Sequence, residues 1–249
     1  MNRSKFFILL LGAALIFFLI FLSSCGNKEN KSSEATVDTT ATTTPVTPTP
    51  TSTIINTPQN MMVVKHKVAD FEKWKMSYDE HDSMRLASGI HRYVIGRGLQ
   101  DPNMVIVAVK VDDIEKAKTF AKDPSLKKAM QKGGVMGMPT FSYTTMVYQD
   151  TGTVSTSLRS RTSFMVKDWD AWQKAFEASM QERMDNGIMI RAYGHDVDNN
   201  KKVTVVAALV DSTKAFAYWK ADAVKKRMAE SGMMGTPDRF LYNVVEIIR

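Results

Sequence analysis

The feature of this chain that most constrains its fold is an internal repeat. When the 249-residue sequence is aligned with itself at a constant shift of 98 residues, one half matches the other without a gap. The clearest matches are Val68–Trp74 with Val166–Trp172, Arg85 with Arg183, Gly96 with Gly194, and Gly134–Pro139 with Gly232–Pro237. A gapless match over about ninety positions is typical of two tandem copies of one structural unit. The repeat predicts a first module at 61–149, a Gly/Ser/Thr-rich linker at 150–159 and a second module at 160–249.

Both copies predict the same order of elements. In the first copy, apolar residues alternate with lysines over Met62–Val68, which indicates a strand, and Asp70 then occupies a helix N-cap position. Helical spacing follows at Phe71, Trp74, Tyr78 and His81, up to Gly89. The remaining expected elements are strands over Arg92–Gly98 and Met104–Val111, a helix from Asp113 that is interrupted near Asp123-Pro124, a Gly-rich turn before Pro139, and a strand over Phe141–Tyr148. The order β-α-β-β-α-β is that of a ferredoxin-like α+β unit.

One strand of each copy is apolar on both faces. These strands are expected over Met104–Val111 and Val203–Val210. A strand of this kind has to be covered twice, and the two helices of a ferredoxin-like unit cover a single face of its sheet. We therefore expect the two copies to pack sheet to sheet as an intrachain dimeric α/β barrel, so that the protein is a monomer with an internal pseudo-dimer.

The motifs of the first copy resemble a known superfamily. They are Val68-x-Asp70-Phe71-x-x-Trp74-Lys75, Asp79-Glu80-His81 with Arg85 and Gly89-Ile90, and Gly134-Val135-x-Gly137-x-Pro139. This pattern is similar to that of the dimeric α/β-barrel superfamily, and within it to small antibiotic-biosynthesis-monooxygenase-like proteins. The resemblance covers 61–149 and, more weakly, 160–249. It implies the fold and leaves the activity open, because the superfamily includes cofactor-free oxygenases, haem-handling enzymes, cyclases, isomerases and proteins with no known reaction.

The first 25 residues predict export and lipid attachment. A basic start with Arg3 and Lys5 precedes an apolar run over Phe6–Leu22, which ends in Leu22-Ser23-Ser24-Cys25. This order is typical of a secretory signal, and its end resembles the lipobox of bacterial lipoproteins. We expect a signal peptide at 1–24, a lipid such as palmitate on Cys25, and a location in the cell envelope, on the periplasmic side of the outer membrane. An uncleaved membrane helix is the alternative.

Composition restricts the partners of the mature chain. Residues 25–60 are rich in Thr, Ser and Pro, with almost nothing to bury, which predicts a solvated spacer between the lipid and the folded part. Cys25 is the only cysteine, so no disulfide can stabilise the modules. Loss of Arg3 and Lys5 with the signal lowers the net charge from +7 to +5, without any long basic run. The sequence argues against nucleic acid and favours a membrane, through the anchor, and a small apolar ligand.

His81 is the most suggestive position for chemistry. It precedes Arg85 by four residues, so both side chains are expected to project from one helix face toward the sheet. A neighbouring arginine lowers the proton affinity of a histidine, which suits a neutral base for an acidic C–H or a phenolic proton. His81 and Arg85 are therefore the candidate catalytic residues. The alternative is that both stabilise helix packing and are bonded to backbone carbonyls.

Further residues are candidates for ligand binding. They are His66, Trp74, Tyr78 and His91. His66 is in strand phase with Val64 and Val68, so its side chain is expected to point into an apolar layer. The alternative is a core histidine whose ring nitrogens are satisfied by hydrogen bonds, which is the commoner outcome for such a position.

The second copy keeps the arginine and loses the histidines. His66, His81 and His91 are replaced by Phe164, Ser179 and Met189. The retention of Arg85 as Arg183 favours a structural clamp that pairs with an acid such as Asp113 or Asp211. A functional site is therefore expected in the first half alone.

Metal and cofactor signals are weak. The histidines lack the close pairwise spacing of metal ligands and no thiolate can join them, so we expect no metal site. No cofactor is expected either, although haem ligation by one histidine stays open. Two functions remain: an envelope protein that binds, oxidises or isomerises a small apolar or aromatic molecule, or a non-catalytic ligand-binding or structural module. The sequence leaves open whether the protein is an enzyme.

Overall fold

The computed structural model describes residues 53–248. The predicted signal peptide at 1–24, the predicted lipid attachment at Cys25 and the predicted spacer as far as residue 52 lie outside the described residues. Within residues 53–248, no helix combines the length and the apolar character that crossing a membrane requires.

The first half of the described chain alternates strands and helices. Its elements are β1 (Ile54–Ile55), β2 (Gln59–Val68), α1 (Phe71–Glu80), α2 (Asp82–Ala87), β3 (Ile90–Gly98), β4 (Met104–Val111), α3 (Ile114–Ala121), α4 (Pro124–Lys132) and β5 (Val135–Asp150). Strand β1 pairs with the end of β5, so regular structure begins before residue 61. Strand β4 has the predicted bounds, and β2 and β3 contain the predicted strands.

The second half repeats this order. Its elements are β6 (Leu158–Val166), α5 (Trp169–Ala178), α6 (Met180–Asp185), β7 (Ile188–Asp196), β8 (Lys202–Leu209), α7 (Ser212–Lys220), α8 (Asp222–Glu230) and β9 (Met233–Ile247). Both halves therefore follow the ferredoxin-like order, with each predicted helix present as two consecutive pieces.

The first predicted helix is divided at His81. Asp70 accepts a hydrogen bond from the backbone N–H of Lys73 at 2.7 Å, as expected of an N-cap. The backbone of His81 leaves the helical region at φ −97° and ψ 21°, and Ser179 marks the same break in the second half. The prediction of one continuous helix was wrong, because the spacing of apolar residues does not reveal a local break. The predicted end is confirmed by Gly89, whose φ of 66° suits a residue without a Cβ.

Strand β5 is much longer than the predicted strand over Phe141–Tyr148. Gly133 and Gly134 form the predicted turn, whereas the rest of the Gly-rich segment, from Val135, is the beginning of this strand. A bulge absorbs the extra residues, because Lys65 pairs with Thr140 whereas Lys67 pairs with Met136. Gly137 has a φ of 69° and Pro139 has no N–H to donate, so both residues suit an irregular stretch of strand. The bulge lies opposite His66.

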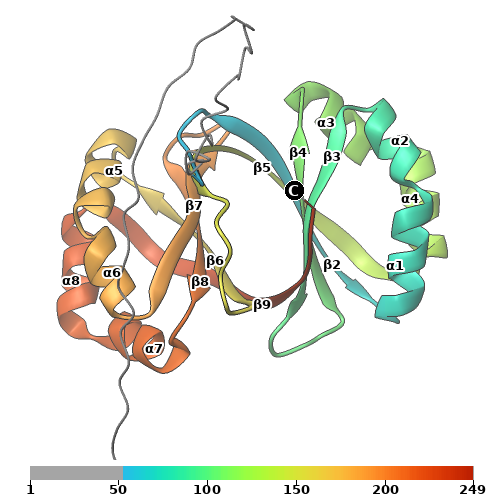
Figure 1. The fold of residues 1–249 in the computed structure, drawn as a ribbon. Coiled ribbons are helices and arrows are strands. Elements are labelled where there is room, and N and C mark those ends of the chain that lie inside the picture. The colour runs from blue at the N-terminus through green and yellow to red at the C-terminus, as the bar shows by residue number, and fades with distance from the viewer. Residues whose placement is uncertain (1–52, 249) are drawn as a thin grey trace, which may run out of the picture. The chain divides into compact units, whose positions relative to one another are not determined.

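Within residues 53–248, the strands form one sheet that closes on itself. The order is β1-β5-β2-β4-β3-β9-β6-β8-β7, and β7 also pairs with β5. Eight strands therefore make a ring, in which β3–β9 and β5–β7 are the two seams between the halves. Figure 1 shows α1–α4 on one outer side of this ring and α5–α8 on the opposite side. The predicted intrachain pseudo-dimer is confirmed as a fold.

A glycine lies at the same repeat position in each seam. A Cβ on Gly96 of β3 would meet the Tyr242 ring at 2.3 Å, and a Cβ on Gly194 of β7 would meet the Thr145 carbonyl oxygen at 2.0 Å. Real Cβ atoms do not approach other atoms this closely. The retained Gly96–Gly194 pair is therefore explained by close packing where the halves join.

Strand β4 confirms the two-sided coverage expected from its sequence. Its residues Val105, Val107, Val109 and Val111 belong to a core under the helices of the first half. Ile106 faces the ring interior, where it packs with Val63 and Tyr242. A matching core lies under the helices of the second half. The outer faces of the strands thus build two helix-covered cores, and the inner faces enclose a third apolar region.

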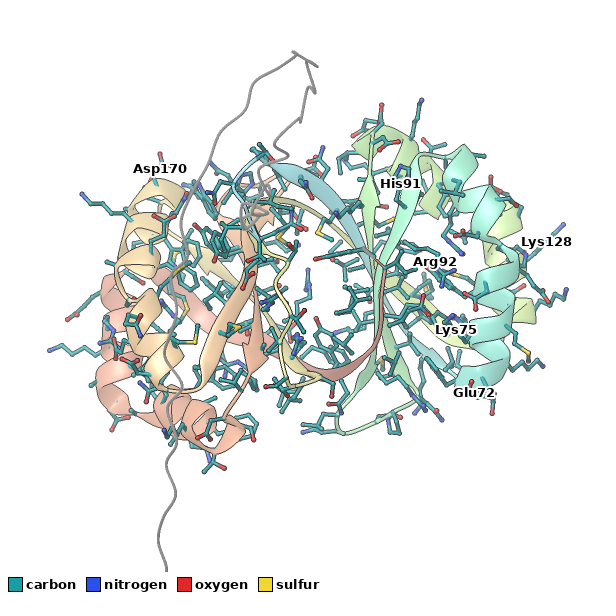
Figure 2. The ribbon with its side chains drawn as sticks, in the orientation of Figure 1. Glu72, Lys75, His91, Arg92, Lys128 and Asp170 are labelled. Carbon is teal, nitrogen blue, oxygen red and sulfur yellow. The ribbon has the colours of Figure 1, made fainter. Side chains whose placement is uncertain are left out.

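An ion network ties the first helix to the seam. Lys75 of α1 bonds Asp79 at 2.6 Å and Glu246 of β9 at 2.8 Å, and Arg92 of β3 bonds the same two carboxylates. Figure 2 shows Lys75 and Arg92 between α1 and the sheet. Because Glu246 comes from the other half, this network links the two halves as well as helix and sheet.

Candidate functional site

A pocket lies between the sheet and the helices of the first half. Its volume is ≈ 70 Å³. Five of the predicted site residues line it: His66, Trp74, Tyr78, His81 and Arg85. They come from β2, α1, the α1–α2 junction and α2. The fold therefore brings together residues that are up to nineteen positions apart in the sequence.

His66 is the most unusual group in this pocket. Its side chain is 4% exposed, and neither Nδ1 nor Nε2 has a hydrogen-bond partner in the protein. Its ring centroid lies 5.4 Å from that of Trp74. Burial lowers the pKa of His66 to about 4, so the ring is neutral near pH 7. The expectation of a hydrogen-bonded core histidine is wrong within the described structure, because the ring lies against Trp74 and the cross-strand neighbour of His66 in β4 is Val105.

The environment of His81 agrees with the alternative expected from the sequence, in which its side chain is bonded to a backbone carbonyl. It is half-buried, and its Nδ1 lies 2.6 Å from the carbonyl oxygen of Ser77. Because it caps α1, it does not share one continuous helix with Arg85. His81 and Arg85 still line the same pocket, and the Arg85 backbone N–H donates to the His81 carbonyl oxygen at 3.4 Å. No hydrogen bond between their side chains is present in the described residues.

Arg85 is a buried clamp on an aromatic ring. Its guanidinium lies 3.7 Å from the centroid of the Tyr78 ring, and Nη2 donates to Asp82 at 2.9 Å. The predicted pairing with Asp113 is wrong, because Asp113 is the N-cap of α3 and accepts from the Lys116 N–H. Stacking on a π face adds to the ion pair and orients the arginine.

Arg183 repeats the clamp in the second half without a carboxylate. Its guanidinium lies 3.9 Å from the Phe176 ring centroid, and Nη1 donates to the Phe176 carbonyl oxygen at 2.7 Å. Burial lowers the pKa of Arg183 to about 10. The suggested partner Asp211 instead caps α7 through the Lys214 N–H. The retained arginine therefore stabilises an aromatic ring in both halves, whereas its predicted acid partners are helix caps.

Tyr78 adds a second buried polar group without a partner. Its ring stacks on Trp74 with centroids 5.1 Å apart, and its hydroxyl is buried without a hydrogen bond. Burial raises the pKa of Tyr78, so the phenol stays protonated at neutral pH. The Tyr78 hydroxyl and the two His66 nitrogens are thus unused donors and acceptors among residues of one pocket.

His91 is not among the residues that line this pocket. It is exposed on β3, and its Nε2 lies 3.0 Å from both carboxylate oxygens of Asp112. In Figure 2 it stands toward the opposite end of the sheet from Glu72, which lies in the first turn of α1. The structure does not place His91 with the other predicted ligand-binding residues.

The second half has an equivalent pocket of ≈ 90 Å³. Phe164, Trp172, Phe176, Ser179 and Arg183 line it at the repeat positions of His66, Trp74, Tyr78, His81 and Arg85. Its polar groups have partners: Ser179 donates to the Ala175 carbonyl oxygen, and Arg227 donates to the Tyr218 hydroxyl. The two pockets share a frame and differ in their polar groups.

A third cavity was not predicted. It lies inside the ring and has a volume of ≈ 330 Å³. Its basic lining residues include Arg159 and Arg161 of β6, and Arg159 belongs to the predicted linker at 150–159. Two arginines at alternate positions of a strand, opposite apolar residues in the other copy, were the available signal. This signal was missed because the start of β6 was placed too late.

Metal and haem binding can be tested against these cavities. Among residues 53–248, no group of three or more His, Cys, Asp or Glu side chains is arranged to hold a metal ion. His66 and His81 are the pocket histidines that could ligate a haem. The space of ≈ 70 Å³ beside them is smaller than the cavity of about 150 Å³ that encloses one benzene, so a porphyrin requires a much larger displacement of the pocket wall than a one- or two-ring molecule does.

Comparisons with known proteins agree with the fold. No family model and no curated protein matches the chain. A proposed monooxygenase from Fusobacterium nucleatum has a similar structure, with a TM-score of 0.52 and 12% sequence identity, over 78% of this chain and 95% of the other. An anthrone oxidase-like protein matches with a TM-score of 0.51 and 13% identity, over 78% of this chain and 94% of the other. The chain has a ferredoxin-like dimeric α/β-barrel fold, with both halves in one polypeptide.

Proposed function

We propose that the first-half pocket binds a small, mostly apolar molecule that carries a hydroxyl or carbonyl group, with His66 as its hydrogen-bonding partner. The observation that carries this proposal is the unpaired state of both His66 nitrogens in a buried pocket. A buried polar group without a partner destabilises a fold by about 1–3 kcal/mol. A neutral imidazole offers one N–H and one lone pair, so it suits either a hydroxyl or a carbonyl.

The pocket walls define the rest of the ligand. Apart from His66, His81, Arg85 and the Tyr78 hydroxyl, the lining is mainly apolar and aromatic. Small-molecule sites typically combine such walls with a few polar groups that fix orientation. Trp74 and Tyr78 offer π faces that favour a flat ligand, which supports an aromatic or quinone-like molecule.

Helix α4 is the part of the wall best suited to yield to a ligand. It contributes Leu126, Ala129 and Met130 to the pocket but has no fully buried side chain. An element with few buried apolar groups opens at a low free energy. A ring-sized ligand exceeds the ≈ 70 Å³ of the pocket, so entry is expected to displace Leu126 and Met130 outward.

A second candidate function is chemistry on the bound molecule. The neutral state of His66 suits a general base for a phenolic or activated C–H proton, which is the first step of many oxidations and isomerisations. The likeness to proposed monooxygenases shows the fold alone, so this activity rests on His66. His81 lines the same pocket and remains a second candidate base, with Arg85 beside it. The alternative is a non-catalytic module that binds or only supports structure.

The binding test compares the two halves directly. His66→Phe installs the residue that the second copy has at the same position. Isothermal titration with naphthol and 1,4-naphthoquinone is expected to show saturable binding to the wild type and at least a tenfold loss in His66→Phe. The matched control, Phe164→His in the second half, is expected to leave the first site unchanged. Equal affinity of wild type and His66→Phe would overturn the proposal.

The catalytic candidate needs a separate assay. Turnover of phenols or quinols under air is expected to fall in His66→Phe and, if His81 is the base, in His81→Ala. If the wild type binds these molecules but neither it nor any variant turns them over, the catalytic function is excluded for them and the non-catalytic function is supported. The His81→Ala variant is informative because His81 bonds only a backbone carbonyl, so its loss removes no side-chain partner.

We propose further that the protein works at the cell envelope, attached through a lipid on Cys25. The support is the sequence Leu22-Ser23-Ser24-Cys25 after the apolar run. Labelling cells with a palmitate analogue is expected to mark the wild-type protein and not the Cys25→Ser variant. Mass spectrometry is expected to show that the mature protein begins at Cys25. An unlabelled wild type that keeps residues 1–24 would contradict the anchor.

A further inference from the structure

The cavity inside the ring is separate from the pocket between the sheet and the helices of the first half. It lies on the face of the sheet that points away from the helices, and its volume of ≈ 330 Å³ falls within the usual range for ligand sites, about 300–1,000 Å³. Its apolar walls come from both halves and include Met61, Val63, Ile106, Val206 and Val244. A space of this size in a protein interior is larger than packing defects usually are.

The charged residues of this cavity do not balance. Four cationic side chains line it, Lys110, Arg159, Arg161 and Arg191, against the single carboxylate of Asp150. Asp150 is already paired, because it accepts from Arg191 at 2.6 Å. Within the described residues, the other three cations form no ion pair. A positive excess among apolar walls is unfavourable unless an anion compensates it.

The two arginines of β6 have hydrogen-bonding capacity to spare. Arg159 is 7% exposed and donates only through Nη1, to the carbonyl oxygens of Thr156 and Leu158. Arg161 donates to the hydroxyls of Ser163 and Ser142 at 3.1 Å, and its buried Nε has no partner. Neutral oxygens therefore surround both guanidinium groups.

Nearby acids do not neutralise Arg161. Asp196 and Asp238 influence its charge from a distance, but neither forms an ion pair with it. Burial lowers the pKa of Arg161 and that of Arg159. An arginine stays protonated near neutral pH in spite of such a shift, so both groups carry charge in a desolvated place.

The internal repeat places different residue types on two facing strands of the cavity. The positions of Arg159 and Arg161 in β6 correspond to Met61 and Val63 in β2. In the closed order of strands, β2 and β6 stand four places apart in a ring of eight, so they face each other across the interior. The residues of β2 are therefore apolar where the facing residues of β6 are cationic. A ligand that matches both walls has an apolar body and an anionic head.

We propose that this cavity binds a small organic carboxylate with an apolar body. Its carboxylate meets Arg159 and Arg161, because guanidinium groups match carboxylates through paired charge-assisted hydrogen bonds. Its apolar part lies against Met61 and Val63. Phosphate matches the same arginines, so inorganic phosphate is one of the controls in the test.

Octanoate is the probe for the test, with 1-octanol as the control that keeps the apolar body without the charge and inorganic phosphate as the control that is an anion without an apolar body. Titration calorimetry of the wild-type residue 25–249 chain is expected to show one saturable site for octanoate and at least tenfold weaker binding of either control. Equal binding of 1-octanol would remove the role of the arginines, and equal binding of phosphate would remove that of the apolar wall. Absence of octanoate binding would overturn the proposal.

Arg161→Met separates binding from stability. It is expected to weaken octanoate binding tenfold or more and to leave Tm unchanged or raised, because it removes a buried charge without an acid partner. Lys128→Met, at an exposed position on α4 labelled in Figure 2, removes the same charge far from the cavity and is expected to bind normally. Unchanged affinity in Arg161→Met would contradict the assignment.

Ala192→Leu provides a second variant that keeps both arginines. Ala192 lines the cavity on β7, so a larger side chain fills the space and is expected to abolish octanoate binding. If octanoate binds this variant with the same affinity as the wild type, it binds outside this cavity, and the proposal is contradicted. His66→Phe is expected to retain octanoate binding, which keeps this test distinct from that of the first-half pocket.

Discussion

The pockets of the two halves are built on the same frame, but their polar groups differ. Each pocket is lined by a buried tryptophan, Trp74 or Trp172. Each also has an arginine whose guanidinium lies 3.7 or 3.9 Å from the centroid of an aromatic ring. The first pocket keeps polar atoms without partners, whereas the polar groups described for the second are bonded within the protein. Duplication has retained what holds helix to sheet. Among the residues that line these two pockets, the buried polar atoms without partners all lie in the first half, so a ligand can gain hydrogen bonds there.

The largest expected effect tests the shared frame. Trp74→Ala and Trp172→Ala are each expected to lower the free energy of unfolding by about 3–5 kcal/mol, the usual range for large-to-small changes at a buried aromatic. Trp172 has four aromatic neighbours and Trp74 has three, so the second-half variant is expected to lose at least as much. Urea denaturation measures both. A loss below 1 kcal/mol in one half alone would mean that the frames are not equivalent.

The pH dependence of stability sharpens the difference between the halves. The pKa of His66 is about 4 in the folded protein against an ordinary value of 6.5, so below pH 6.5 the unfolded chain binds a proton that the folded protein excludes. Stability is expected to fall by about 3 kcal/mol as pH drops from 6.5 to 4, and this contribution levels off below 4. The difference between wild type and His66→Phe isolates it from the carboxylates. Parallel pH profiles of the two proteins would contradict the buried, neutral histidine.

A reciprocal exchange tests the unpaired groups. His66→Phe is expected to raise the free energy of unfolding at pH 7 by about 1 kcal/mol, because an unsatisfied buried group is removed. Phe164→His is expected to lower it by about 1–3 kcal/mol for the opposite reason. Thermal unfolding of both variants gives the comparison. Destabilisation by His66→Phe would indicate that His66 has a partner, or a shape, that phenylalanine cannot replace.

The smallest expected effect concerns the two arginine clamps. Asp82 pairs with Arg85, and the repeat position in the second half is Met180. Asp82→Met is expected to change stability by at most about 1 kcal/mol, because Asp82 is partly exposed and Arg85 keeps its stacking on Tyr78. Urea denaturation in low and high salt checks this. A loss of several kcal/mol would show that the clamp of the first half depends on its acid.

Much of the fold follows from sequence patterns of long range. The repeat at a shift of 98 residues predicts two equal halves, and the two-sided apolar strand at 104–111 predicts that their sheets cover each other. Both predictions are confirmed, because they depend on burial over many residues. The break at His81 and the bulge at Gly137 were missed, since each depends on one or two backbone angles that apolar spacing does not encode.

The site was only partly predictable for a similar reason. Strand and helix periodicity place His66, Trp74 and Tyr78 toward one layer, and the fold brings them together. Periodicity does not show which polar atoms find partners, so His66 was expected to be satisfied and His81 was preferred as the base. Prediction of the cavity inside the ring requires the register of the strands across the two seams. The local sequence around Arg159 and Arg161 does not contain that information.

The closed order of strands also has a consequence for the chain during its synthesis. The outer edge of β3 has no partner until β9, residues 233–247, has been synthesised, and the outer edge of β5 waits for β7. A nascent chain that has completed only its first half therefore presents two open β edges, which are sites for wrong pairing with other chains. Protection from aggregation arrives with the final strand, so shortened chains and slow late synthesis are where this protein is most vulnerable.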